Sequence, residues 1–532
     1  MTALGTGSAG GATAGTVVGA TVPSATTFDP AGCAPLTAGR TDFGAVLPGQ
    51  LAVTTQDCTI IFGSSNDTAS LRLGQTDGLD RAMWAPPSGP TDPGFGTSGT
   101  TTTDLPNGAE HIWGAVEAAD GTIYVAGASK NADASDQVTI GKYTAAGVLV
   151  PGFGTGGIKT INLDAGVSDF AWDIALQADG KPVLSVNAAT SRILRLDATT
   201  GALDGTFGSG GSVSMPGGFV GKKIEVAPSG AIVATGTSYA STPTCMAVRV
   251  TSGGILDPSW GTGGVAQFGI SGRDTACDGM AIQPDGLVVV AGRTNLVSSD
   301  NGSIVARFNA AGTALDNTFG TSGYRLADIP TNGDEFQEVA LAADGSMIAT
   351  GIPGAPGTHL TKLNSAGTIV WDRVDAAGPQ TARDVVVLPD GRFMTSGNYG
   401  AANVARYSAT GFLDTSFNNT GWRTLTAPTD LHENGGILLH DGRYLMAGSG
   451  STGAWQLTVL SSTTIPDHAG GTADWSAGAA GMFGACLNTL GGGAVGTWNA
   501  VSGCAASNSV GWHAVQSTTE TAAATPTGVT SA

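Results

Sequence analysis

Residues 283–323 read QPDGLVVVAGRTNLVSSDNGSIVARFNAAGTALDNTFGTSG and contain two signatures that recur along the chain. The first is a D-G turn between two apolar strands, at Asp285-Gly286. The second is an F-G-x-x-G turn that follows L-D-x-x, here Leu315-Asp316 and then Phe319-Gly320 with Gly323. Self-similarity at a fixed period, here roughly 55 residues, indicates stacked structural units.

The D-G signature occurs seven times, with turn glycines at Gly121, Gly180, Gly230, Gly286, Gly345, Gly391 and Gly442. The third copy has Ser229 in place of Asp. Asp-Gly between alternating apolar residues favours a tight type I′ hairpin, in which both central residues take positive φ. Each copy therefore predicts two antiparallel strands.

The F-G-x-x-G signature alternates with the hairpins and starts at Phe95, Phe153, Phe207, Trp260, Phe319 and Phe417, with a degenerate copy around Ile369-Val370-Trp371. A third strand follows each hairpin and a fourth follows each F-G-x-x-G turn. Four short antiparallel strands per repeat are the anatomy of a propeller blade. The pattern predicts an all-β chain with a seven-bladed β-propeller over residues 92–461.

The order of the two signatures predicts how the ring closes. The first F-G-x-x-G turn, at Phe95, has no D-G hairpin before it, and the last hairpin, at Gly442, has no F-G-x-x-G turn after it. We therefore expect residues 99–105 to form the outer strand of the last blade, beside residues 455–460. Such closure protects strand edges that would otherwise invite aggregation.

These repeats resemble the delta-60 family, whose pattern is met nearly whole by residues 283–323 and less completely over 92–461. The chain departs from it at Ser229 and at Trp371-Asp372, which replaces the F-G turn. The resemblance implies a propeller of secreted and surface bacterial proteins, generally without an assigned reaction. It supplies no catalytic residues.

Composition excludes several classes of partner. The 532 residues carry a net charge of −19, 12% are charged and seven are lysines, so a phosphate-binding surface for nucleic acid is not expected. No apolar run reaches the length of about 18 residues that a membrane-spanning helix needs.

The six cysteines fall into three neighbouring pairs, Cys33 with Cys58, Cys245 with Cys277, and Cys486 with Cys504. We predict three disulfides and a secreted or cell-surface protein. No Lys or Arg precedes Arg40, so a signal peptide is missing from the sequence as given. A mature or truncated form, or release by lysis as for a phage component, would account for this.

The flanks, residues 1–84 and 467–532, lack the repeat and contain short strand-like runs. Because ring closure brings residues 92 and 461 to one blade, we expect both flanks to form one immunoglobulin-like β-sandwich. The first flank resembles pilin-type and spore-coat-U-type immunoglobulin-like domains, on Cys33, Phe43-Gly44, Pro48-Gly49 and residues 58–63. This resemblance implies assembly by strand donation from a partner.

No motif for catalysis, a metal or a cofactor is expected: H-E-x-x-H and G-x-S-x-G are absent, and F-G-x-x-G precedes a strand, where it cannot present helix amides to a phosphate. Aligning the position eight residues before each D-G glycine gives candidates at the channel mouth: Trp113, Trp172, Lys222, Asp278, Gln337, Arg383 and Asn434. The next position adds Asp173, Lys223, Glu338 and Asp384. These could hold a sugar or a peptide, or they could simply be hydrated strand ends.

Three functions remain open. The first is a structural or adhesive surface protein, whose sandwich mediates self-assembly or attachment to a surface polymer. The second is a carbohydrate- or peptide-binding module that uses the channel mouth. The third, a propeller lactonase or lyase, would need a cluster of carboxylates or histidines at the channel that the aligned positions do not supply.

Overall fold

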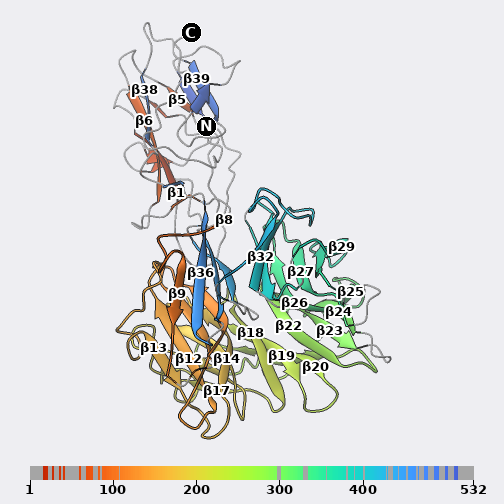
Figure 1. Ribbon diagram of the computed structural model, residues 1–532. Coiled ribbons are helices and arrows are strands. Elements are labelled where there is room, and N and C mark those ends of the chain that lie inside the picture. The colour runs from red at the N-terminus through yellow and green to blue at the C-terminus, as the bar shows by residue number, and fades with distance from the viewer. Residues whose placement is uncertain are drawn as a thin grey trace. The chain divides into compact units, whose positions relative to one another are not determined.

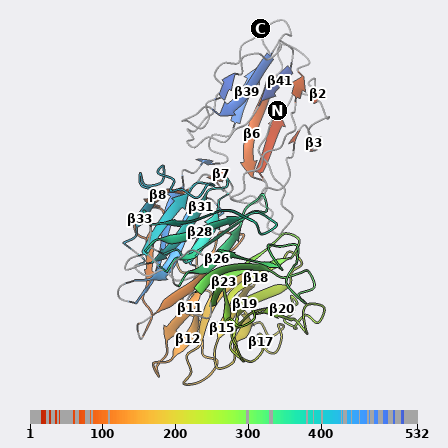
Figure 2. The ribbon, with the colours of Figure 1, turned by 90° about the vertical axis from the view of Figure 1, so that its right-hand side faces the viewer.

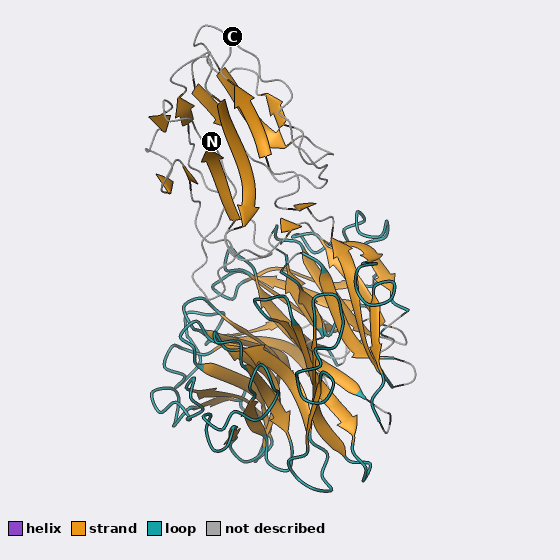
Figure 3. Cartoon of the chain, turned by 90° about the vertical axis from the view of Figure 1, so that its left-hand side faces the viewer, coloured by secondary structure: helices purple, strands orange, loops and turns teal. Residues whose placement is uncertain are grey.

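The computed structural model describes residues 87–462 apart from short gaps, and isolated strands in both flanks. The gaps lie at 107, 109, 296–300, 328–332, 355, 379–380, 389, 399–401, 427, 429–434, 441 and 451–452. The chain divides into two compact units, one of which comprises Ser88–Leu438 and Tyr444–Leu460. Throughout the described ranges the chain forms strands, turns and loops and no helix (Figure 3).

The unit that comprises Ser88–Leu438 and Tyr444–Leu460 is a ring of seven antiparallel blades (Figure 1, Figure 2). Blade 1 contains β10 (His111–Glu117), β11 (Ile123–Lys130), β12 (Asp136–Tyr143) and β13 (Ile158–Ile161). Blade 2 contains β14 (Phe170–Leu176), β15 (Pro182–Asn187), β16 (Arg192–Arg195) and β17 (Ser212–Ser214). Blade 3 contains β18 (Phe219–Val226), β19 (Ile232–Ser238), β20 (Thr244–Val250) and β21 (Val265–Phe268).

The remaining blades repeat this order. Blade 4 contains β22 (Thr275–Ile282), β23 (Val288–Asn295), β24 (Asn301–Arg307) and β25 (Tyr324–Ala327). Blade 5 contains β26 (Glu335–Leu341), β27 (Met347–Ile352), β28 (Thr358–Leu363) and β29 (Ile369–Asp375). Blade 6 contains β30 (Asp384–Val387), β31 (Phe393–Asn398), β32 (Ala402–Tyr407) and β33 (Trp422–Thr424). Blade 7 contains β34 (Gly436–Leu438), β35 (Tyr444–Ser449), β36 (Trp455–Ser462), β9 (Thr100–Thr103) and β8 (Pro87–Thr91).

The ring closes as predicted. Each innermost strand contacts that of the next blade, from β10 through β34 and back to β10. Strand β9 pairs with β36 antiparallel, with Thr100 opposite Thr458 and Thr103 opposite Trp455. The buried Glu110 adds to this closure, because its carboxylate accepts hydrogen bonds from the amides of Leu105 at 2.9 Å and Trp455 at 3.2 Å. A strand from the start of the repeats therefore completes the last blade.

The D-G turns differ from the predicted type I′ hairpin. In the first copy, Gly121 N donates to Ala118 O at 2.8 Å and Ala118 N donates to Thr122 O at 2.7 Å, which encloses a three-residue loop. Gly121 has φ +80°, and Asp120 is not among the described non-glycine residues with positive φ. Instead, Asp120 Oδ1 accepts a hydrogen bond from Thr122 N at 3.0 Å. A type I turn followed by a left-handed glycine fits this pattern, so the type I′ prediction was wrong.

The F-G-x-x-G turns join each blade to the next. The Phe ring is buried, and the following Gly N donates to a turn of the next blade, as from Gly154 to Thr200 O at 2.9 Å. That turn carries a glycine against the ring: a Cβ on Gly201 would lie 3.0 Å from the Phe153 ring. Trp371 takes the same place in the degenerate copy, where a Cβ on Gly411 would lie 2.7 Å from its ring.

The L-D and Arg positions of the repeat form a pair inside the blade. Arg307 donates from Nε to Asp316 Oδ2 at 2.9 Å, and its guanidinium lies 4.8 Å from the centre of the Phe319 ring. Arg195, Arg249 and Arg406 make the corresponding ion pairs and ring contacts in three other blades. The motif thus fixes the F-G turn against its own third strand.

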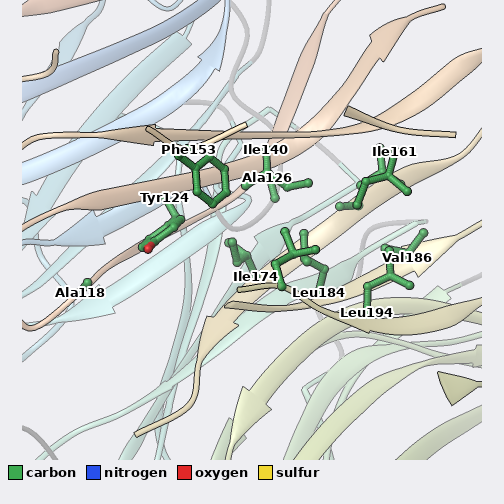
Figure 4. Close-up of a cluster of buried hydrophobic side chains, with 13 residues drawn as sticks. Ala118, Tyr124, Ala126, Ile140, Phe153, Ile161, Ile174, Leu184, Val186 and Leu194 are labelled. Atoms are coloured by element: carbon green, nitrogen blue, oxygen red, sulfur yellow. The ribbon is translucent and has the colours of Figure 1, made fainter. Parts of the chain in front are cut away.

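The core consists of apolar layers between adjacent blades. Between blades 1 and 2, Tyr124, Ile140 and Phe153 pack with Ile174, Leu184 and Leu194 (Figure 4). Each such side chain, when fully buried, contributes roughly 1.5 to 3 kcal/mol relative to exposure. The packing therefore holds the blades side by side and leaves their innermost edges around a channel.

The second unit contains strands from both chain ends. They are β1 (Thr16–Thr21), β2 (Thr27–Phe28), β3 (Pro35–Leu36), β4 (Arg40–Thr41), β5 (Thr59–Ile61), β6 (Thr68–Gln75), β7 (Ala82–Met83), β37 (Ile465–Pro466), β38 (Thr472–Ser476), β39 (Gly484–Leu490), β40 (Trp498–Ala500) and β41 (Ser509–Trp512). Strand β6 pairs with β1 and β38, and β41 pairs with β5 and β39. The side chains of these strands lie outside the described residues, as do Cys33, Cys58 and Cys504. The immunoglobulin-like sandwich and two of the disulfides therefore stay predictions.

Candidate functional site

The candidate positions at the channel mouth are the bulged residues of the innermost strands. The pairing register skips Trp113 in β10, Trp172 in β14, Lys222 in β18, Asp278 in β22 and Gln337 in β26. A bulge leaves one residue unpaired and re-aims its side chain. Arg383 directly precedes β30, and Asn434 lies outside the described residues. The sequence alignment thus identified a real structural position in five blades.

The bulge also explains a glycine of the repeat. Gly292 of β23 lies opposite the bulge of β22, and a Cβ on it would overlap the backbone oxygen of Ala276. A Cβ on Gly127 would likewise overlap the backbone oxygen of His111. The glycine of the A-G pair in the second strand is therefore required, because the bulge opposite it leaves no room for a Cβ.

Aromatic side chains form one side of the mouth. The Trp113 ring lies 5.4 Å from Phe170 and 5.2 Å from Trp172, measured between ring centres. The His111 ring lies 5.2 Å from that of Trp113, measured between ring centres. Lys222 Nζ sits over the Trp172 ring, 3.7 Å from its centre. This cation–π contact joins the aromatic side to a charged one.

The charged side contains side chains of both signs from blades 3, 4 and 5. Lys222 Nζ lies 3.9 Å from Asp278 Oδ1, and Arg293 Nη1 lies 3.5 Å from Asp278 Oδ2. Arg293 also donates to Glu335 Oε2 at 2.6 Å, and Gln337 Nε2 donates to Glu335 Oε1 at 2.7 Å. Burial disfavours the charge of Arg293, but Asp278 and Glu335 outweigh it and raise its pKa. These side chains hold one another in place.

Two cavities open at this mouth. The smaller, of about 220 Å³, is lined by Val220, Lys222, Thr237, Tyr239, Asp278, Arg293, Glu335, Gln337, Ile352 and Arg383. The larger, of about 400 Å³, is lined by Ser168, Phe170, residues 187–191, residues 216–219, Val220 and Tyr239. Val220 and Tyr239 line both, so the cavities adjoin. We call the two together the mouth groove; it takes its walls from blades 2 to 6.

The residues one step deeper form a buried ionic cluster. Lys223 Nζ lies 2.7 Å from Glu338 Oε2 and 3.9 Å from Asp173 Oδ2. The carboxylates accept hydrogen bonds from backbone amides of neighbouring blades. Asp173 accepts one from Ile224 N at 2.9 Å, and Glu338 accepts one from Met280 N at 3.2 Å. Asp384 accepts from Gly436 at 2.7 Å in the same way. The cluster thus ties the innermost strands together across the channel.

Burial sets the protonation of this cluster. A further member is Glu225, whose carboxylate accepts a hydrogen bond from Ile282 N at 3.0 Å. Burial raises the pKa of Asp173 to about 6 and that of Glu225 to about 7, although Lys223 opposes both shifts. It also raises the pKa of Glu338, again against the attraction of Lys223. The pKa of Lys223 is raised, because Glu338 and Asp173 outweigh the cost of burying its charge. The cluster therefore loses protons within the neutral range.

Within the described ranges, no three His, Cys, Asp or Glu residues are grouped so that they could hold a metal ion. A Ser-His-Asp arrangement does occur away from the mouth: His359 Nδ1 lies 3.3 Å from Ser303 Oγ, and His359 Nε2 lies 2.8 Å from Asp372 Oδ1. Ser303 and His359 are fully buried. Ser303 belongs to β24 and His359 to β28, so the arrangement joins blades 4 and 5.

The predicted disulfide between Cys245 and Cys277 is present, with Cα atoms 5.2 Å apart. It links β20 of blade 3 to β22 of blade 4, and Cys277 directly precedes the bulged Asp278. The disulfide thus supports the charged side of the mouth. The described residues include no helix that is long and apolar enough to cross a membrane.

The structure brings most of the predicted mouth residues together. Lys222, Asp278, Gln337 and Arg383 line one cavity, and Trp113 and Trp172 contact each other beside it. Asp173 belongs to the buried cluster instead. Sequence analysis missed Arg293 in β23, Glu335 at the start of β26, and Tyr239 directly after β19. None of the three lies at the aligned position, so the alignment could not find them.

Comparison with known proteins supports the fold. Residues 283–319 and 389–417 match the family described as "Domain of unknown function (DUF5122) beta-propeller". The match and the seven-bladed ring confirm the resemblance to a family of propeller repeats. No curated protein matches the sequence.

Several solved structures are similar at low identity. A protein of unknown function from Bacteroides caccae is 12% identical, with coverage of 60% of this chain and 99% of that chain, and a TM-score of 0.33. A structure described as YCF48 bound to D1 peptide is 9% identical, with coverages of 70% and 98% and a TM-score of 0.41. A catalytically inactive virginiamycin B lyase from Staphylococcus aureus, solved with quinupristin, is 13% identical, with coverages of 56% and 94% and a TM-score of 0.33.

Proposed function

We propose that this protein is a non-enzymatic binding protein of the cell exterior and that the mouth groove is its binding site. One observation carries the proposal: the two cavities adjoin at Val220 and Tyr239 and together take their walls from five blades. A concave site with a few convergent polar groups is where proteins bind ligands. An elongated ligand, a glycan or a peptide, fits two adjoining cavities better than a compact one does.

The chemistry of the groove favours recognition. Its charged groups are already engaged with one another, as in the 2.6 Å contact between Arg293 and Glu335. Such paired groups are held in fixed positions and so provide a pre-organised surface for a ligand. Ser303 and His359 of the Ser-His-Asp arrangement are buried, and none of its three residues lines the groove.

The disulfide supports an extracellular location, because disulfides persist mainly in oxidising compartments. We further propose that the flanks attach or assemble the protein, as a surface structural or adhesive component. This is supported by the pairing of strands from the two chain ends, β6 with β38 and β41 with β5. The propeller would then be the recognising part and the flanks the attaching part.

Binding by labelled full-length protein to printed arrays of glycans and of peptides tests the proposal. Tyr239 is 53% exposed and lines both cavities, so Tyr239→Ala should weaken binding by roughly tenfold, as loss of an exposed aromatic anchor does. Phe412→Ala is the matched control, because Phe412 is 64% exposed on an outer turn. Binding to neither array, or binding that Tyr239→Ala leaves unchanged, would show that the groove is not the site.

A further inference from the structure

The wall of the smaller cavity contains charges of both signs that engage one another. It has three cations and two carboxylates, namely Lys222, Arg293, Arg383, Asp278 and Glu335. Asp278 Oδ1 lies 3.9 Å from Lys222 Nζ, and Asp278 Oδ2 lies 3.5 Å from Arg293 Nη1. Arg293 Nη1 also lies 2.6 Å from Glu335 Oε2. Each carboxylate of the wall thus already has a cation beside it.

Four carboxylates and one further cation lie on the same innermost strands and belong to the same balance. They are Asp173, Glu225, Glu338, Asp384 and Lys223. Burial raises the pKa of Asp173, Glu225 and Glu338, so these carboxyls keep part of their protons near neutral pH. The negative charge that remains on them offsets the excess of one cation in the wall of the smaller cavity. The groove as a whole therefore favours neither an anionic nor a cationic ligand.

The strand edges around the groove argue against a bound peptide. A peptide that adds as a strand needs free amides and carbonyls along a strand edge, and the innermost strand of each blade is the end strand of its sheet. Side chains of neighbouring blades occupy these groups: Asn187 Oδ1 accepts from Gly221 N at 3.0 Å, and Asn187 Nδ2 donates to Gly221 O at 3.2 Å. Four more amides donate to carboxylates, Ile224 to Asp173, Met280 to Glu338, Ile282 to Glu225 and Gly436 to Asp384.

The side chains of the smaller cavity suit hydroxyl groups. A sugar hydroxyl donates one hydrogen bond and accepts others, so it fits a wall that presents fixed donors and acceptors side by side. Arg293 and Gln337 Nε2 both donate to Glu335, at 2.6 and 2.7 Å, which fixes a guanidinium, a carboxylate and an amide next to one another. Hydrogen bonds to such ionised groups are stronger than neutral ones and need no charge on the ligand.

The larger cavity offers an apolar platform beside this wall. None of the described residues that line it is charged. Tyr239 lines both cavities and is 53% exposed, and Tyr239 N donates to Gly218 O at 2.8 Å. Gly218 is required there, because a Cβ on it would lie 2.6 Å from Ala240 N. The turn thus holds in place an aromatic ring on which the apolar face of a sugar ring can pack.

We propose that the ligand is an uncharged glycan, one sugar ring of which packs on Tyr239 while hydroxyl groups of the next sugar bind Arg293, Glu335 and Gln337. The proposal rests on the proposed function of the groove and names its ligand class. The volume of the larger cavity, about 400 Å³, is within the range of roughly 300 to 1,000 Å³ that small-molecule sites occupy.

The test uses immobilised full-length protein and probes that differ in charge. The neutral probes are mixed oligosaccharides released from cellulose, xylan, mannan and starch, together with chitopentaose and galactotriose. Deacetylated chitopentaose and trigalacturonate are the matched cationic and anionic forms of the last two. A randomised heptapeptide library with both ends capped represents peptides. Retained molecules are quantified by mass spectrometry at low and high salt.

The wild-type protein should retain a neutral oligosaccharide, and salt should change this retention little because no counter-charge is involved. Tyr239→Ala should weaken it by roughly tenfold. Gly217→Trp should abolish it: Gly217 lines the larger cavity, lacks positive φ, and a Cβ on it would meet open space, so the fold tolerates the side chain that fills the cavity. Gly205→Trp is the matched control, because Gly205 has the same freedom in the turn between β16 and β17.

Each other result overturns a stated part of the reasoning. Retention of peptides and of no glycan, abolished by Gly217→Trp, would refute the glycan class and leave the proposed function standing. Retention of only the charged oligosaccharides, with release by salt, would refute the uncharged ligand. Retention of a glycan that Gly217→Trp does not reduce would place its site outside the groove and refute both proposals, as would retention of no probe.

Discussion

Replacing Lys223 with Met should destabilise the ring and should do so in a pH-dependent way. Lys223 is the cation of the buried cluster and lies 2.7 Å from Glu338, with its side chain 13% exposed. Removing one partner of a buried ion pair leaves an uncompensated charge, which costs about 3 to 5 kcal/mol. We expect a loss of this size in the free energy of unfolding at pH 8, where Asp173 and Glu225 are largely ionised.

The loss should shrink as the pH falls. Burial raises the pKa of Asp173 to about 6 and that of Glu225 to about 7, so the folded protein holds protons that the unfolded chain releases near pH 4. Their contribution to stability is present below pH 4 and is lost as the pH rises through 6 and 7. At pH 5 these carboxyls are largely neutral, and Lys223→Met should cost about half as much as at pH 8 or less.

Urea denaturation of the wild type and of Lys223→Met at pH 5 and pH 8 measures both quantities. Lys159→Met is the control, because Lys159 lies on the outer strand β13, where a surface substitution changes stability by about 0.5 kcal/mol or less. The wild type itself should be more stable at pH 5 than at pH 8. A loss below about 1 kcal/mol at pH 8, or equal losses at the two pH values, would refute the role assigned to the cluster.

Three further outcomes are expected. The double variant Cys245→Ser, Cys277→Ser should lower the free energy of unfolding by about 4 kcal/mol, which is the chain-entropy value for a sequence separation of 32. Denaturation under non-reducing conditions measures this loss, and no change would mean that the bond does not constrain the unfolded state. Gly292→Ala should cost roughly 1 to 3 kcal/mol in thermal melts because its Cβ overlaps the bulge backbone, while Gly152→Ala, which faces open space, should be near neutral. Deleting residues 1–28 should leave the propeller folded and abolish self-association in sedimentation; assembly that persists, or a full-length protein that is monomeric at all concentrations, would contradict a role of the flanks in assembly.

The sequence predicted the ring because its signals are local and repeated. The D-G and F-G-x-x-G turns mark strand ends directly, and their order alone placed residues 99–105 beside β36. The hairpin type was missed because Asp120 stabilises its turn through a side-chain hydrogen bond, without adopting positive φ. Asp-Gly is compatible with both turns, so the dipeptide could not decide between them.

The candidate site was only half predictable. Position in the repeat identified Lys222 and Gln337, because a bulge recurs at a fixed distance from the hairpin. Arg293 comes from β23, the second strand of blade 4, and Glu335 from the start of β26 in blade 5. Their 2.6 Å contact depends on how far these two neighbouring blades are offset. That offset is a property of packing between blades, which the repeat period does not encode.

Closure of the ring by β9 sets an order on biosynthesis. The Thr100 hydroxyl hydrogen-bonds to that of Thr458 across 358 residues, so β9 is translated long before the strand it pairs with. At about 5 to 20 residues per second, the ribosome takes roughly 20 to 70 seconds to deliver its partner. During that interval β9 has no sheet to join, so its unpaired backbone groups can pair with another molecule. A nascent or truncated copy that stops short of residue 455 therefore cannot close its ring, and its unpaired β9 stays available to other molecules.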